Sequence, residues 1–271
     1  MNAVGIFDSG VGGLAVQRAV RALLPAQPLI YVADSGYAPY GERDDAFIAE
    51  RAALIADALI ARGAFALVVA FNTATVTTLD VLRTRCAVPI VGIEPAIKPA
   101  AQLTRSGSVL VLATPRTANS AAVARLCAQF GAERDIILQP CPGLADRVEA
   151  GAIDDQATLD LLRHYLAPAT QGAVDTVVLG CTHFAFLHAA IRSLLGPAIA
   201  IVEPSDAVAR QLLRRLPGSP VQASRDASCQ DAYYTTAADP ARVGAVMSKL
   251  LGHAVEVSCA SALGLAPGAR S

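Results

Sequence analysis

The chain has 271 residues and a net charge of −1; 54% of its residues are hydrophobic, 17% are charged and 5% are aromatic. This balance gives no basis for binding nucleic acid or an anionic membrane surface. No apolar stretch approaches the roughly 20 residues of a membrane helix, and the N-terminus lacks a signal-peptide pattern, so we expect a cytoplasmic protein. The six cysteines are scattered without a C-x-x-C pair, which favours reduced thiols over disulfides or a zinc site.

Short apolar runs alternate with helical patterns along the whole chain. The expected strands cover residues 4–7, 29–33, 66–70, 88–93, 109–113, 136–139, 176–180 and 200–202. Helices are expected between them, including a long one that ends near Gly63 and one that Ser120 caps. Alternation of this kind predicts an α/β fold with parallel sheets and right-handed crossovers.

Two crossings between domains are expected, near 94–99 and 203–205. A strand at 231–236 and a helix at 240–251 then complete the first sheet. We therefore predict one domain of residues 1–95 with 206–271 and a second of residues 96–205. The segments LVVAFNTATV and TVVLGCTHFA share a strand followed by a Thr-bearing turn, which indicates two related halves.

Polar residues follow several expected strands, at the sheet edge where open α/β folds bind ligands. Asp8 and Ser9 begin a glycine-rich turn before a helix, and helix N-termini attract carboxylates. The glycine spacing differs from the dinucleotide pattern G-x-G-x-x-G, and a purely structural turn is the alternative. Two more segments fit a ligand site: Pro39-Tyr40-Gly41 and Phe71-Asn72-Thr73. The alternative for the first is an ordinary surface loop, and for the second a polar helix start.

Cys181 is the most informative residue, because Thr182 and His183 follow it directly after an apolar strand. A helix N-terminus and an imidazole both favour the reactive thiolate. A buried inert cysteine is the alternative, but the Cys-Thr-His combination favours a functional one. Three further candidates are an orienting carboxylate and two hydroxyl donors at a strand end: Glu149, Thr114 and Thr117.

Six segments together resemble glutamate racemase, a cofactor-independent family of the aspartate/glutamate racemase superfamily. They are GIFDSGVGGL, ADSGYAPYGE, VGIEPAIKPA, CPGLADRVEAG, LGCTHF and YYTTAADPAR, in the family's order over nearly the whole chain. The resemblance implies two pseudo-symmetric α/β domains with the active site in the cleft between them. It also implies an isomerase that supplies D-glutamate for peptidoglycan without PLP, metal or other cofactor. Glutamate is then the partner molecule, and a homodimer is expected because family members often form dimers.

The resemblance also assigns roles to residues. Racemisation removes the α-proton from one face of the substrate and delivers a proton to the other, and the family uses two cysteines for this. By position, Asp8 would assist the N-terminal cysteine, and His183 and Glu149 would assist Cys181. Substrate binding would fall to Ser9, Tyr40, Gly41, Asn72, Thr73, Thr114, Thr117 and Thr182.

One position departs from the family pattern. The family reads ACNTA where this chain reads AFNTA, so Phe71 stands in the place of the N-terminal cysteine. Phenylalanine carries no transferable proton and is bulkier than a thiol. Losing one general acid or base typically costs about 10²–10⁴-fold in rate, so we expect racemisation to be lost or severely weakened.

Three hypotheses remain open. The first is a glutamate racemase by descent, with impaired activity. The second is a one-cysteine relative of the arylmalonate decarboxylase type, in which Cys181 protonates a carbanion from a single face. The third is a non-catalytic binding or regulatory protein. The segments DSGVGGL and PYGE fit an amino-acid substrate better than an arylmalonate, and this argues against the second hypothesis.

Overall fold

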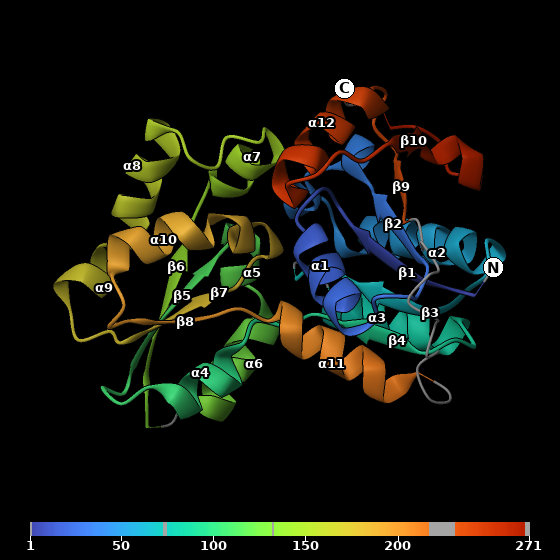
Figure 1. Cartoon of the computed structure of the whole chain (residues 1–271). Coiled ribbons are helices and arrows are strands. Elements are labelled where there is room, and N and C mark those ends of the chain that lie inside the picture. Colours follow the sequence, from blue (N-terminus) through green and yellow to red (C-terminus); the bar gives the residue numbers. More distant parts are fainter. Residues whose placement is uncertain (1, 73–74, 132, 217–230, 269–271) are drawn as a thin grey trace. The chain divides into compact units, whose positions relative to one another are not determined.

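The computed structural model describes residues 2–72, 75–131, 133–216 and 231–268 (Figure 1). The chain divides into two compact units: unit 1 comprises Met1–Ile93 and Ser205–Ser271, and unit 2 comprises Glu94–Pro204. Each unit contains one sheet with helices on its faces, and all the strand pairings described are parallel. The predicted α/β fold class is therefore confirmed. Among the described helices, none has both the length and the apolar character needed to cross a bilayer.

Unit 1 is built on a sheet of strand order β10-β9-β2-β1-β3-β4. The strands are β1 (Ala3–Asp8), β2 (Leu29–Ala33), β3 (Ala64–Val69), β4 (Ile90–Gly92), β9 (Ala232–Thr235) and β10 (Val257–Cys259). All residues of β1 and β2 are buried, as expected for central strands of a parallel sheet covered on both faces. The last two strands come from the C-terminal part of the chain, so this sheet joins the two ends of the sequence.

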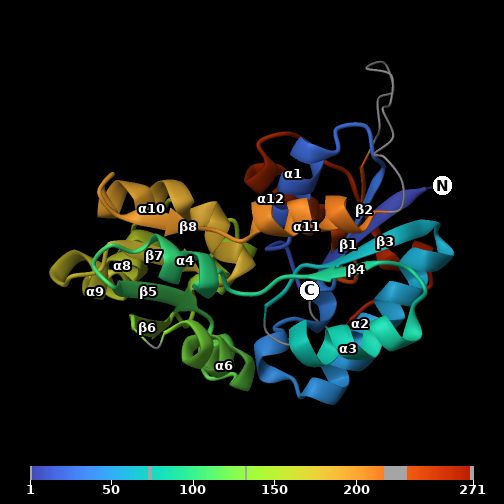
Figure 2. The same ribbon diagram turned by 90° about the horizontal axis from the view of Figure 1, so that it is seen from below.

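Helices cover both faces of this sheet (Figure 2). One face carries α1 (Leu14–Leu23), α11 (Ser205–Arg215) and α12 (Pro240–Leu251), and the other carries α2 (Asp45–Ala61) and α3 (Thr75–Arg85). Short 3₁₀ turns follow two strands: η1 (Ser35–Tyr37), η2 (Tyr40–Glu42) and η4 (Ala260–Leu263). The core under α2 and α3 is built from large apolar side chains, among them Phe7, Ile55, Leu67 and Leu82.

Unit 2 has a smaller sheet, of order β6-β5-β7-β8. Its strands are β5 (Ser108–Ala113), β6 (Asp135–Pro140), β7 (Thr176–Leu179) and β8 (Ala200–Val202). Its helices are α4 (Ile97–Leu103), α5 (Pro115–Ala118), α6 (Ala121–Phe130), α7 (Leu144–Glu149), α8 (Gln156–Tyr165), α9 (Ala167–Gln171), η3 (Thr182–Leu187) and α10 (His188–Leu195). The helices α4 and α6 lie on one face and α8 and α10 on the other (Figure 1). Ser120 caps α6 by accepting a hydrogen bond from the Val123 amide, which confirms the predicted cap.

The order of strands reverses once in each sheet. The chain runs from β1 to β2 on one side and then crosses to β3 on the other side of β1. In unit 2 it runs from β5 to β6 and then crosses to β7. Open α/β sheets bind ligands at the carboxyl ends of the strands beside such a reversal. The ends of β1 and β3, and of β5 and β7, are therefore where each unit is expected to place functional side chains.

Candidate functional site

A thiol, an imidazole and a carboxylate lie in series at the carboxyl end of β7. The Cys181 sulfur is 3.6 Å from Nδ1 of His183, and Nε2 of the same ring is 2.5 Å from Oε1 of Glu149. The cysteine and histidine side chains are buried, whereas the Glu149 side chain is 31% exposed. The structure thus brings together three residues that the sequence places up to 34 positions apart.

The charges of this series favour a protonated histidine. Burial opposes the charged ring, but the hydrogen bonds and electrostatic interactions with Cys181 and Glu149 outweigh it, and the pKa of His183 is raised well above its ordinary value. An imidazolium next to a sulfur stabilises the thiolate electrostatically. The arrangement is therefore suited to a thiolate that accepts a proton from carbon.

Local backbone geometry explains how the thiol reaches this place. Gly180 donates its amide to the Leu112 carbonyl, and a Cβ at this glycine would lie only 2.7 Å from that carbonyl oxygen. The glycine therefore lets β7 end close against β5. The helix expected after Cys181 begins as the six-residue 3₁₀ helix η3 and becomes α-helical only in α10.

Hydroxyl groups surround the same edge of unit 2. The Thr114 hydroxyl caps α5 by accepting from the Thr117 amide, and it donates to the Thr117 hydroxyl at 2.9 Å. Thr182 is buried at the start of η3. All three therefore lie on segments that follow β5 or β7, on either side of the reversal in strand order.

Cys141 is a second thiol at this edge that the sequence reasoning did not assign to the site. It follows β6, is buried, and lies 3.3 Å from the Gln139 carbonyl oxygen, to which its thiol donates. Burial raises the pKa of the Cys141 thiol to about 12, with a smaller contribution from Cys181. Cys141 is thus held as a neutral thiol. Its only sequence signal is its place after a strand, in the segment CPG.

In unit 1, Asp8 and Ser9 close the end of β1. The Asp8 carboxylate is buried and accepts the Ser9 amide at 2.6 Å and the Ser9 hydroxyl at 3.3 Å. The turn that follows needs glycine at position 13, because a Cβ there would lie 2.9 Å from both the Asp8 Cβ and the Ala70 Cβ. The glycine-rich segment therefore keeps Asp8 close to the end of β3.

Tyr40 lies in η2 with its hydroxyl turned inward. The side chain is 3% exposed, and its hydroxyl donates to Asp34 at 2.5 Å. Burial and the negative charge of Asp34 raise the pKa of the Tyr40 phenol well above its ordinary value. The phenol that the sequence suggested as a ligand group is thus engaged by a buried carboxylate, while Gly41 beside it is exposed.

Phe71 and Asn72 follow β3, and Thr73 lies outside the described residues. The Phe71 ring is 3% exposed and belongs to the hydrophobic core of unit 1. It meets the Phe7 ring at 6.0 Å and the Tyr40 ring edge-on at 5.4 Å. The bulk of this side chain is therefore accommodated by packing against other aromatic rings, where burial of its apolar surface is favourable.

The predicted site residues thus fall into two groups. Unit 1 holds Asp8, Ser9, Tyr40, Gly41, Phe71 and Asn72, and unit 2 holds Thr114, Thr117, Glu149, Cys181, Thr182 and His183. Asp34 and Arg51 join the first group, although neither was singled out from the sequence. A usable signal existed for Asp34, because the triplet Asp-Ser-Gly stands at the carboxyl end of both β1 and β2. Among the described residues, no three His, Cys, Asp or Glu side chains are placed to hold a metal ion.

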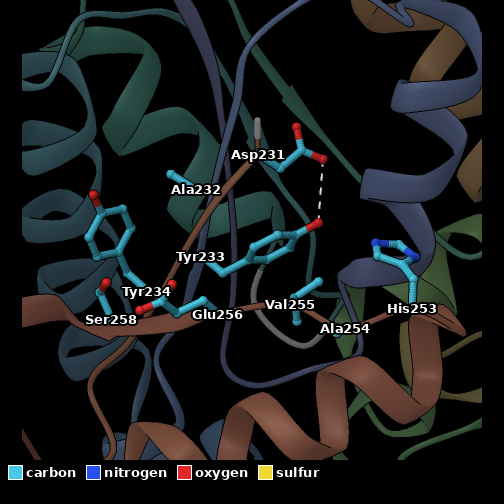
Figure 3. A pocket seen from close by; sticks show the side chains of 9 residues that line it. All are labelled: Asp231, Ala232, Tyr233, Tyr234, His253, Ala254, Val255, Glu256 and Ser258. Carbon is cyan, nitrogen blue, oxygen red and sulfur yellow. Dashed lines mark hydrogen bonds between the residues drawn. The ribbon is translucent and has the colours of Figure 1, made fainter. Parts of the chain in front are cut away.

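A separate hollow of about 540 Å³ lies on unit 1, along β9 and the segment after α12 (Figure 3). It contains none of the predicted site residues; its polar lining includes Asp231, Tyr233 and His253. Asp231 accepts hydrogen bonds from Tyr233 at 3.3 Å and from Gln17 at 2.5 Å, and it pairs with Arg21. The carboxylate in this hollow is therefore already engaged by groups of the protein.

Comparison with known proteins gives consistent matches. The family model described as Asp/Glu/Hydantoin racemase matches residues 14–212. A glutamate racemase from Ectopseudomonas mendocina is 48% identical over 255 residues, which cover 94% of this chain and 96% of that protein. One from Ralstonia nicotianae is 43% identical, covering 93% of this chain and 90% of that protein.

Solved structures agree with these relatives. Escherichia coli glutamate racemase, in complex with L-glutamate and the activator UDP-MurNAc-Ala, is 33% identical with a TM-score of 0.82. The match covers 96% of this chain and 98% of that one. A glutamate racemase isoform from Bacillus anthracis is 27% identical with a TM-score of 0.81, over 95% of this chain and 97% of that one.

Proposed function

The chain belongs to the Asp/Glu/Hydantoin racemase family, and on this premise we propose that it is a glutamate racemase by descent, an isomerase that acts on glutamate. The observation that carries the proposal is the series of Cys181, His183 and Glu149 at the reversal in strand order of unit 2. Its proposed role is to supply D-glutamate for peptidoglycan in the cytoplasm. That role rests on the family resemblance and on the names of the relatives.

The proposed chemistry begins at the Cys181 sulfur. The thiolate takes the α-proton of bound glutamate: the Cα–H bond breaks, an S–H bond forms, and the electron pair stays on the α-carbon. Before this transfer the His183 imidazolium stabilises the sulfur's charge, and Glu149 holds the ring in place. A hydroxyl donor such as that of Thr117, which accepts the Thr114 hydroxyl and keeps its own proton, stabilises the charge that develops on the substrate carboxylate.

Completing racemisation requires a proton carrier for the other face of the α-carbon. Phe71 stands where the family places that carrier, and its ring has no proton to give. Cys181 therefore reprotonates the α-carbon from the same face, after the proton on its sulfur has exchanged with a proton of the solvent. We propose that the chain exchanges the α-proton of one enantiomer of glutamate and inverts it slowly, with a loss of about 10²–10⁴-fold.

Incubation with L-glutamate and, separately, D-glutamate in D₂O tests this function. Proton NMR follows loss of the α-proton, and chiral chromatography follows inversion. We expect α-proton exchange from one enantiomer with little inversion. The variant Cys181→Ser serves as the control, because it removes the thiol and keeps a small polar group, and it should show no exchange.

The other outcomes separate the hypotheses. Rapid inversion of both enantiomers would mean that another group replaces the missing cysteine. Absence of exchange from either enantiomer would overturn the catalytic proposal. Glutamate binding without exchange would favour a non-catalytic protein, and proton incorporation into an arylmalonate would favour the decarboxylase type.

We also propose that residues 1–95 with 206–271 and residues 96–205 act as two racemase domains. The division into two compact units with separate sheets supports this assignment. A homodimer is proposed from the family resemblance alone, and sedimentation velocity would measure it.

A further inference from the structure

Asp34 is a fully buried carboxylate just beyond β2, and its side chain receives four hydrogen bonds. Arg51 donates to it twice, from Nε at 3.0 Å and from a terminal nitrogen at 2.7 Å. The Tyr40 hydroxyl donates at 2.5 Å and the Thr236 hydroxyl at 2.9 Å. The side chain of Arg51 is only 7% exposed, so both charges of this pair are removed from water.

The donors come from segments that are far apart in the sequence. Tyr40 lies in η2, Arg51 in the middle of α2, and Thr236 directly after β9. Thr236 lies 202 positions from Asp34. The Asp34 carboxylate therefore ties the segment that follows it, residues 35–42, to a helix and to the C-terminal part of unit 1.

Further contacts hold the same segment. The Thr236 hydroxyl accepts the Gly36 amide at 3.1 Å, and the Thr236 carbonyl accepts the Gly268 amide at 2.9 Å. The Arg51 guanidinium lies 3.7 Å from the centre of the Tyr37 ring. The turn 35–37 is thus fixed between Arg51 and residues near the C-terminus.

These contacts reach the position of the missing cysteine through Tyr40. Its hydroxyl is bound to Asp34, and its ring meets the Phe71 ring edge-on at 5.4 Å. The buried pair thereby sets where Tyr40 lies against residue 71 and where the exposed Gly41 backbone lies. Both Gly41 and residue 71 belong to the candidate substrate site.

The design of the pair indicates what it does. Burying two charges is costly, and even complete hydrogen bonding often gives no more stability than apolar residues would. The best-attested use of such pairs is to fix one arrangement among several. Here Tyr40 belongs to the segment that follows β2. The other two donors to Asp34 also contact that segment: Arg51 at the Tyr37 ring and Thr236 at the Gly36 amide.

We infer that Arg51 and Asp34 are positioning residues for glutamate: they hold segment 35–42 and residue 71 in the binding arrangement without touching the substrate. This inference rests on the proposed function, since it names glutamate as the ligand. The fixing of segment 35–42 itself depends only on the observed contacts.

The test compares Arg51→Met, Arg51→Lys and Tyr40→Phe with the unchanged chain. Methionine keeps the apolar stem of Arg51 and removes its charge, lysine keeps the charge without the paired donors, and Tyr40→Phe removes one donor while keeping the ring on Phe71. Arg21→Met is the matched control, because Arg21 pairs with Asp231 in the same unit, away from segment 35–42. Amide hydrogen exchange of segment 35–42 and calorimetric binding of each glutamate enantiomer are measured at a temperature where every variant is folded.

For Arg51→Met we expect exchange in segment 35–42 to rise and glutamate affinity to fall, each by about tenfold or more, because a displaced contact weakens binding steeply. Arg51→Lys and Tyr40→Phe should give smaller changes in the same direction. Arg21→Met should leave both quantities within about twofold of the unchanged chain, because it breaks no contact of this segment.

The remaining outcomes decide against one proposal or the other. Unchanged exchange in segment 35–42 for both Arg51→Met and Tyr40→Phe overturns the inference. Faster exchange with unchanged affinity also overturns it, because the pair would then stabilise the fold only. If the unchanged chain binds no glutamate, the proposed function fails. Amide hydrogen exchange then shows by itself whether Arg51 and Asp34 hold segment 35–42. If Arg51→Met does not fold, Tyr40→Phe decides.

Discussion

His183 is the residue on which the chemistry of unit 2 depends, because its two ring nitrogens face two different acids. Nδ1 lies next to the Cys181 sulfur and Nε2 next to the Glu149 carboxylate. A carboxylate on one nitrogen fixes the ring orientation and stabilises the positive charge that the sulfur experiences. Glu149 is therefore expected to act on the sulfur through the ring.

The variant Glu149→Gln tests this dependence. Since interactions with Cys181 and Glu149 raise the pKa of His183, removing the carboxylate lowers that pKa. The imidazolium then loses its proton at a lower pH than in the unchanged chain. NMR titration of the ring protons measures the change, with Glu256→Gln in unit 1 as the control. An unaltered titration of His183 would contradict the proposed role of Glu149.

Phe71→Cys has a stability cost that must be separated from its effect on catalysis. The ring is buried against Phe7 and Tyr40, and truncating a buried aromatic ring typically costs 3–5 kcal/mol when alanine replaces it. Because cysteine retains one more heavy atom, we expect the free energy of unfolding to fall by about 2–4 kcal/mol. Urea denaturation measures this loss. Phe71→Leu, which keeps most of the apolar volume, should lose less than about 1.5 kcal/mol, and equal losses for both variants would contradict the packing described.

At the scale of elements, one polar connection joins the starts of β5 and β7 in unit 2. Asp175 precedes β7 and accepts the Thr104 hydroxyl at 2.6 Å and the amides of Arg105 and Ser106 at 2.7 and 2.9 Å. These bonds join the segment before β5 to the start of β7, at the opposite end of the strands from Cys181. The relative position of the two strands that carry Thr114 and Cys181 therefore depends in part on one carboxylate.

Asp175→Asn should destabilise the protein in a pH-dependent way. Partial burial opposes the charge, but the hydrogen bonds outweigh it and hold the pKa of Asp175 well below its ordinary value. A lowered pKa in the folded state stabilises the fold above the unfolded pKa near 4, and this stability is lost as the pH falls below that value. We expect a loss of about 1 kcal/mol at pH 7, reduced for solvent screening, and a smaller loss at pH 3.

Urea denaturation at pH 7, 5 and 3 follows this difference. The exposed Asp160, which pairs with Arg163, provides the control variant Asp160→Asn, expected to change stability by less than about 0.5 kcal/mol at each pH. A loss for Asp175→Asn that stays constant or grows on acidification would contradict the assignment.

The strands were largely predictable because buried parallel strands are short apolar runs. Residues 29–33 and 200–202 have the expected bounds, and the expected 66–70 is observed as Ala64–Val69. The sequence did not indicate β10, whose residues are only partly buried at the sheet's edge. β10 is only three residues long and has a serine at its centre, so it contains no apolar run that a sequence pattern could reveal.

The site was predictable only where its residues are neighbours or fit a family pattern. Cys181 and His183 lie two positions apart, and Glu149, a candidate carboxylate in the sequence, was assigned to the same thiol only by the resemblance. The contacts of Asp34 with Arg51 and Thr236 span 17 and 202 positions, and no periodicity in the sequence specifies which polar groups meet after folding. The Tyr40 hydroxyl points inward because it donates to the buried Asp34 carboxylate, and the sequence could not predict this direction without that contact.

At the scale of the whole molecule, the proposed racemisation requires proton carriers at positions 71 and 181, which belong to different units. We expect Phe71→Cys to raise the racemisation rate by about 10² or more, since a general acid or base contributes 10²–10⁴-fold. In the background of Cys181→Ser the same change should give no increase, because removing a proton from one face and adding one to the other form a single reaction. The four rates of this cycle, measured by chiral chromatography on folded proteins, are therefore strongly non-additive. Equal gains in both backgrounds would mean that the cysteine at position 71 acts without Cys181, and that the two-carrier mechanism does not apply to this chain.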